Sequence, residues 1–167
     1  IDAVDEHYYE STGWFLHNID YYDNYDRKAP KVYLGEYASH TRTMESALAE
    51  AIYLCNLERN GDVVEMASYA PLLCNEKHKN WNPNLIYFDE TNIVTTPSYE
   101  TQALFSHYSG DNYINSRINI DKKYAYRVAS SVVRDDSTGK TYLKLVNALP
   151  VKVCIKVKGI NISPNTR

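Results

Sequence analysis

The sequence lacks a long apolar stretch and lacks an excess of basic residues. None of its hydrophobic runs approaches the roughly 20 residues that a helix needs to span a bilayer. Its 18 lysines and arginines are outnumbered by 21 aspartates and glutamates, which gives a formal net charge of −3. This balance does not favour nucleic acid as a partner, because phosphate backbones are bound through clustered cations. We therefore predict neither a membrane nor a nucleic-acid partner.

Cysteine is also scarce. Cys55, Cys74 and Cys154 cannot all pair, and no Cys-x-x-Cys or Cys/His metal-ligand spacing occurs. His7 and His40 could begin a metal site, but no third ligand has a supporting spacing. We predict no metal, and the redox compartment stays open.

The 167-residue sequence has no initiator methionine and no signal peptide. Its first residues, Ile1 to Val4, look like the inside of a strand, so we expect the chain to be a piece of a larger protein. Because no targeting segment lies within it, the compartment is not predicted, and the periplasm and the extracellular space both remain candidates. The composition, with 44% hydrophobic and 23% charged residues, is typical of a globular protein.

Strands and helices alternate over the first two thirds of the chain. The residue patterns predict strands over 1–9, 31–37 and 63–73, and helices over 11–25, 44–57 and 98–108. The unbroken apolar run of the strand over 31–37 is typical of a strand buried on both faces of a parallel sheet. A polar loop over 75–84 follows the third strand. This order predicts a parallel α/β sheet or barrel.

The pattern changes after about residue 112. Two β-rich segments, 124–134 and 141–146, flank the turn from Asp135 to Gly139, which predicts a hairpin. Over 151–162 apolar residues alternate with lysines, as in an antiparallel strand with one wet face. We therefore expect an α/β region over 1–112 and an all-β region over 113–167.

Polar side chains follow two of the predicted strands. The sequence His7-Tyr8-Tyr9 lies near the end of the first strand, and Glu36 follows Gly35 in the second. Functional groups of parallel α/β folds gather at the carboxyl ends of strands, so Glu36 is a candidate acid, base or nucleophile. A lone glutamate there is more often structural, and His7 also suits a hydrogen-bonded core position. The 16 tyrosines fit a carbohydrate- or protein-binding surface as well as half-buried packing.

Four motifs, in order along the chain, resemble the α-L-arabinofuranosidases of glycoside hydrolase family 51. They are DEHYY over 5–9, GEYA over 35–38, MASYAPLL over 66–73 and WNPNLIYFD over 81–89, and the segment over 96–105 also fits. The resemblance covers essentially the whole chain. It implies the last strands and helices of a (β/α)₈ barrel over 1–112, followed over 113–167 by an incomplete β-sandwich of jelly-roll character.

The resemblance also implies an activity. Family members are retaining hydrolases that remove terminal α-L-arabinofuranosyl groups from arabinan- and arabinoxylan-type saccharides, without a cofactor. Glu36 matches the nucleophile, Tyr9 the tyrosine that positions it, and His7 a polar support on the same strand. Trp81 and Asn82 would line the sugar pocket. The partner would then be an arabinose-containing oligo- or polysaccharide, and a homo-oligomer remains open.

The second catalytic carboxyl of such an enzyme is missing. In the family it is a glutamate that follows an asparagine on the fourth barrel strand, and this chain has no such strand. Glu10, Glu76 and Glu90 lie in the wrong sequence context to replace it. We therefore expect the chain alone to be inactive. The alternative hypothesis is a non-catalytic module that binds polysaccharide or stabilises its parent protein.

Overall fold

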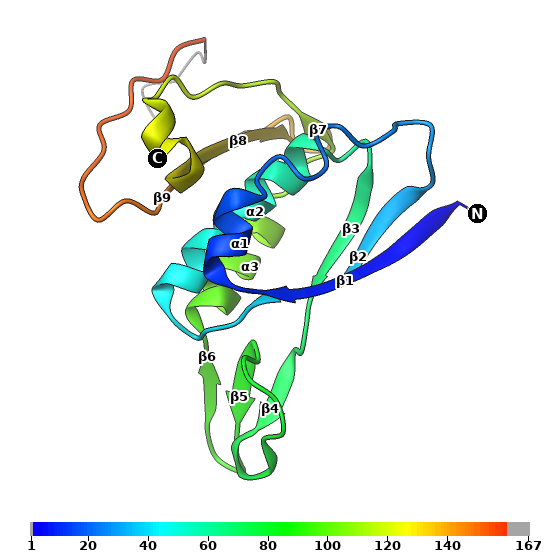
Figure 1. Ribbon diagram of the computed structural model, residues 1–167, viewed down its shortest axis with the longest axis vertical. Coiled ribbons are helices and arrows are strands. Elements are labelled where there is room, and N and C mark those ends of the chain that lie inside the picture. The colour runs from blue at the N-terminus through cyan, green and yellow to red at the C-terminus, as the bar shows by residue number, and fades with distance from the viewer. Residues whose placement is uncertain (1, 160–167) are drawn as a thin grey trace.

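A parallel sheet organises the first half of the chain. The computed structural model describes residues 2–159, and in it three strands pair in parallel in the order β1-β2-β3 (Figure 1). Their bounds are Ala3–Glu10 for β1, Lys31–Ser39 for β2 and Val64–Tyr69 for β3. Val32 and Leu34 of β2 are fully buried, as its apolar run predicts. The predicted parallel arrangement of these strands is confirmed.

Three helices cover one face of this sheet (Figure 1). They are α1 (Thr12–His17), α2 (Met44–Arg59) and α3 (Pro97–His107). Side chains alternate along β1, so that Tyr8 contacts the core while Asp5 and His7 on the opposite face are exposed. We call this second face of the β1-β2-β3 sheet the open face. Nothing in residues 2–159 packs over it in the way the helices cover the first face.

The first helix is shorter than the predicted helix over 11–25. α1 ends at His17, and turns follow over 19–25. Asn18 caps the helix, because its side-chain amide and its backbone N–H both donate to the Trp14 carbonyl. Arg27 Nη1 then donates to the carbonyl of Tyr22 in the turns that follow. Tyr22 is nevertheless buried. The apolar spacing over 11–25 therefore indicates which side chains pack into the core, and it does not show that the helix continues.

A small second sheet projects as an arm between β3 and α3 (Figure 1). It consists of β4 (Leu73–Asn75), β5 (Ile86–Phe88) and β6 (Ile93–Thr95), with the short 3₁₀-helix η1 (Glu76–His78) after β4. The prediction of one strand over 63–73 is therefore wrong. β3 ends before Pro71, which has no N–H to donate to a sheet. The predicted loop over 75–84 contains η1.

The third sheet is antiparallel. It consists of β7 (Asn112–Tyr113), β8 (Val128–Arg134) and β9 (Thr141–Asn147), and the 3₁₀-helix η2 (Lys122–Arg127) precedes β8. The predicted hairpin at 135–139 is confirmed. Its turn is closed by the Asp135 carboxylate, which accepts from Ser137 and Thr138, and by Gly139 at φ 69°.

The strand predicted over 151–162 is wrong for residues 151–159, which form no strand; its remaining residues lie outside the described part of the chain. Alternation of apolar residues and lysines indicates a segment with one apolar and one solvated face. A segment with this pattern forms a strand only where a neighbouring strand is available for pairing. None of the helices in the described part combines the length and the apolarity that crossing a membrane requires.

A buried glutamate connects α2 to the end of β2. Glu50 is fully buried, and its Oε1 accepts the backbone N–H of Ser39 at 2.9 Å. Its Oε2 is buried without a hydrogen-bond partner among the described residues. Burial raises the pKa of Glu50 to about 7, and the hydrogen bond from the Ser39 N–H opposes the rise. Glu50 therefore changes charge near neutral pH.

We expect this titration to make the free energy of unfolding depend on pH. Between pH 4.5 and about 7 the folded chain binds a proton at Glu50 that the unfolded chain releases, so stability falls as pH rises through this window. Relative to a Glu50→Gln variant, the wild type should lose about 3 kcal/mol between pH 4.5 and pH 8. Urea denaturation at several pH values measures the difference. Exposed Glu65 supplies the control, Glu65→Gln, and parallel curves for wild type and Glu50→Gln would rule this account out.

Candidate active site at the ends of β1 and β2

A bulge in β2 places Glu36 on the open face. In the pairing of β1 with β2, Glu6 lies opposite Leu34 and His7 lies opposite Glu36, so Gly35 is the extra residue. Strict alternation from buried Leu34 would turn Glu36 toward the helices. The extra residue lets Leu34 and Tyr37 both be buried while the Glu36 side chain remains 42% exposed. The carboxylate is therefore accessible from the open face.

Tyr9 holds this carboxylate. The Tyr9 hydroxyl, from the end of β1, donates a hydrogen bond to Glu36 Oε2. Burial raises the pKa of Tyr9 to about 12, and the hydrogen bond and negative charge of Glu36 contribute to the rise. Tyr9 therefore remains a protonated donor at all physiological pH values. A hydrogen bond to one oxygen of the carboxylate restricts the rotation of the Glu36 side chain.

His7 lies against the same oxygen. Its Nδ1 is 3.7 Å from Glu36 Oε2, and its Nε2 is 3.0 Å from Asp5 Oδ2. Within residues 2–159 no hydrogen bond is recorded to Glu36 Oε1, in contrast to Oε2. The two oxygens of one carboxylate therefore have different surroundings.

The arm places an aromatic side chain, Trp81, beside Tyr9. The Trp81 ring lies edge-on to Tyr9 at a centroid distance of 5.4 Å, and Trp81 is 49% exposed. Asn82 accepts from the hydroxyl of buried Tyr87 at 3.2 Å, inside the arm. The structure thus brings Glu36, Tyr9, His7 and Trp81 together. It links Asn82 to them only through the neighbouring Trp81, and the role of Asn82 stays a prediction.

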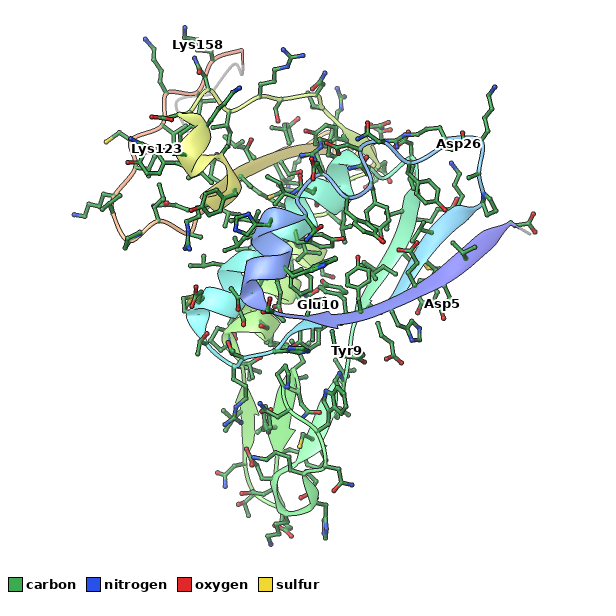
Figure 2. The ribbon with its side chains drawn as sticks, in the orientation of Figure 1. Asp5, Tyr9, Glu10, Asp26, Lys123 and Lys158 are labelled. Atoms are coloured by element: carbon green, nitrogen blue, oxygen red, sulfur yellow. The ribbon has the colours of Figure 1, made fainter. Side chains whose placement is uncertain are left out.

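Sequence reasoning missed Asp5 and the bulge. Asp5 is two residues before His7 and four before Tyr9, so the period of two places all three on one face of β1, as Figure 2 shows for Asp5 and Tyr9. That spacing was the available signal. The only signal for the bulge was Gly35 itself, because an isolated glycine within a strand often marks a bulge.

The parallel sheet with helices on one face makes this an α/β protein. The half-exposed Glu36 carboxylate, which accepts a hydrogen bond from Tyr9 where the strands end, is its candidate active site. The family model described as "Alpha-L-arabinofuranosidase C-terminal domain" matches residues 21–165. The chain belongs to the α-L-arabinofuranosidases of glycoside hydrolase family 51, and it corresponds to their C-terminal region. The family resemblance of the four motifs is thereby confirmed.

Individual relatives agree with this assignment. The chain is 49% identical over 117 residues to an extracellular exo-α-L-arabinofuranosidase of Streptomyces chartreusis; the matched region covers 70% of this chain and 14% of that protein. It is 35% identical over 149 residues to α-L-arabinofuranosidase 1 of Arabidopsis thaliana; here the matched region covers 86% of this chain and 22% of that protein. The chain therefore spans between about a seventh and about a fifth of the length of these relatives.

A solved structure supports the fold. The arabinose-bound MgGH51 α-L-arabinofuranosidase superposes with a TM-score of 0.81 at 32% identity, over 88% of this chain and 26% of that one. The mixed α/β architecture with small parallel and antiparallel sheets is therefore that of the C-terminal region of family 51 enzymes.

Proposed function

We propose that this chain supplies the nucleophile of a retaining α-L-arabinofuranosidase and acts within a longer polypeptide that supplies the acid/base. The observation that carries the proposal is the hydrogen bond from Tyr9 to Glu36 Oε2 between neighbouring parallel strands. Residues 1–112 would form the last strands and helices of a (β/α)₈ barrel, and residues 113–167 would begin the C-terminal sandwich. The parallel β1-β2-β3 sheet with helices on one face supports the first assignment, and the antiparallel β7–β9 sheet supports the second.

The two oxygens of Glu36 would have separate tasks. Oε2 is bound by Tyr9, so Oε1 attacks the anomeric carbon of the arabinofuranosyl group. The glycosidic bond breaks, and the leaving oxygen takes a proton from the second carboxyl. Water, deprotonated by that same carboxyl, then cleaves the arabinosyl ester of Glu36. Two displacements at one carbon retain the configuration, and no cofactor takes part.

The substrate would be a terminal α-L-arabinofuranosyl group on an arabinan- or arabinoxylan-type saccharide. The half-exposed face of Trp81 beside Tyr9 suits an apolar sugar face, with Asn82 next to it. A non-catalytic module that binds polysaccharide would use the same tryptophan. It would not need a tyrosine held against a carboxylate, and this contact favours the hydrolase.

The stereochemistry of transfer to methanol tests the proposal. The longer polypeptide, incubated with an aryl α-L-arabinofuranoside in dilute methanol, should form methyl α-L-arabinofuranoside, which does not mutarotate and is identified by NMR. Formation of the methyl β-anomer would mean a single displacement and would exclude a nucleophilic role for Glu36.

The 167-residue chain alone should not turn over an aryl α-L-arabinofuranoside, because it lacks the second carboxyl. Release of the aryl alcohol, measured by absorbance against the longer polypeptide at equal concentration, checks this expectation. Turnover by the chain that disappears in its Glu36→Gln variant would show that the active site is complete without further sequence.

Replacing Tyr9 by Phe in the longer polypeptide should lower kcat about 10- to 100-fold, with little change in KM. This range corresponds to the loss of one hydrogen bond to a charged group. Tyr33 offers a matched control, because its hydroxyl contacts Ser68 at 3.2 Å and not Glu36. Similar kcat values for Tyr9→Phe and Tyr33→Phe would remove Tyr9 from the mechanism.

A further inference from the structure

Asp5, His7 and Gly35 form a cluster beside Glu36 that the proposed mechanism does not use. Asp5 Oδ2 lies 3.0 Å from His7 Nε2, and the other ring nitrogen, Nδ1, lies 3.7 Å from Glu36 Oε2. Asp5 and His7 come from β1 and Gly35 and Glu36 from the neighbouring β2, where His7 lies opposite Glu36. The ring of His7 thus stands between two carboxylates.

Gly35 provides the space that the Asp5 carboxylate occupies. A Cβ at position 35 would lie 2.2 Å from Asp5 Oδ1 and 3.1 Å from His7 Nε2. The first distance is far below any contact between these atoms. Gly35 does not have a positive φ, so its backbone conformation does not require glycine. With a side chain at 35, the exposed Asp5 carboxylate would have to rotate away from its place beside His7, and in this sense Asp5 and Gly35 are a matched pair.

Asp5 also determines which nitrogen of His7 carries a proton. An ionised carboxylate can only accept, so the contact to Asp5 requires a proton on Nε2. In the neutral ring, Nδ1 then has a lone pair and donates nothing to Glu36. The opposite tautomer would place two lone pairs against each other at Asp5 and an N–H against Glu36. That N–H would compete with the Tyr9 hydroxyl for Glu36 Oε2 and would draw the carboxylate away from the position that Tyr9 sets.

We propose that Asp5 is a positioning residue for the hydrolysis: it fixes His7 with Nε2 protonated and Nδ1 toward Glu36 Oε2, in space that exists because residue 35 is glycine. The inference rests on the proposed function for its catalytic consequence. Its structural content, a fixed tautomer and a matched pair, holds whether or not the chain takes part in hydrolysis.

Kinetics in the longer polypeptide test the catalytic consequence. Asp5→Ala should lower kcat about 10-fold and leave KM within about twofold, because on this proposal Asp5 acts through His7 and not on the sugar. Asp5→Asn should restore most of this loss, because the amide oxygen can still accept from Nε2–H. Equal kcat values for the two variants, or a change confined to KM, would overturn the positioning role.

Two measurements on the 167-residue chain do not depend on turnover. Nitrogen-15 NMR of the His7 ring, at a pH where it is neutral, should show Nε2 protonated in the wild type and a larger share of the Nδ1–H tautomer in Asp5→Ala. Gly35→Ala should lower the unfolding midpoint in the wild type but much less in an Asp5→Ala background. An unchanged tautomer, or an equal cost of Gly35→Ala in both backgrounds, would overturn the inference without touching the proposed function. If the tautomer and the unfolding midpoints change as expected but the longer polypeptide shows no hydrolysis, the proposed function alone fails.

Discussion

Replacing Glu36 by Gln is expected to lower kcat of the longer polypeptide by about 10⁴-fold or more. The amide has almost the same shape as the carboxylate, and its oxygen can still accept from Tyr9, so the fold and the contact between β1 and β2 should persist. An amide, however, does not displace an alkoxide from the anomeric carbon. The measurement is the steady-state kcat with an aryl α-L-arabinofuranoside.

Glu65 provides the control for this substitution. It is an exposed glutamate on β3, in the same sheet, and Glu65→Gln should leave kcat within about twofold. Thermal denaturation of both variants establishes that each is folded. A loss of less than tenfold in folded Glu36→Gln is incompatible with a nucleophile at this position.

Replacing Lys144 by Met is expected to have the largest effect on stability. Lys144 of β9 is 6% exposed, and its ammonium pairs with Glu58 of α2 and lies 4.9 Å from the centre of the Phe105 ring. The Ser131 hydroxyl of β8 donates to the same glutamate. Methionine keeps the apolar stem but leaves a largely buried carboxylate with Ser131 alone. Removing one partner of such a pair costs about 3 kcal/mol of unfolding free energy.

The control lies in the same hairpin. Lys140 is exposed, so Lys140→Met should change the unfolding free energy by no more than about 0.5 kcal/mol. Adding Glu58→Gln to Lys144→Met should recover part of the loss, because the unpaired charge disappears. If the denaturant midpoints of Lys144→Met and Lys140→Met coincide, the ion pair between Lys144 and Glu58 contributes nothing to stability.

The β1-β2-β3 sheet could be predicted because its signals are local. The apolar run through Val32 and Leu34 predicted a strand buried in a parallel sheet, and helical spacing over 44–57 predicted α2. The helix predicted over 11–25 failed after His17 because Tyr22 packs into the core from a turn. Apolar spacing reports which side chains are buried, and a turn can bury one as well as a helix can.

The site was predictable in its residue types and not in its geometry. The DEHYY and GEYA motifs pointed to His7, Tyr9 and Glu36, and the structure brings these side chains together. The bulge that turns Glu36 to the open face is marked in the sequence only by Gly35, and a glycine there also fits a close approach of two backbones without a bulge. The approach of Trp81 to Tyr9 depends on the arm, whose three-residue strands are too short for a periodic signal.

The role of Glu36 is tested most directly by azide rescue of a Glu36→Ala variant of the longer polypeptide. With an activated aryl α-L-arabinofuranoside, azide should enter the space that the carboxylate vacates and attack the anomeric carbon in one displacement. The predicted product, identified by NMR, is β-L-arabinofuranosyl azide, with inverted configuration. Formation of the α-azide would show that another group is the nucleophile and that Glu36 has a different role.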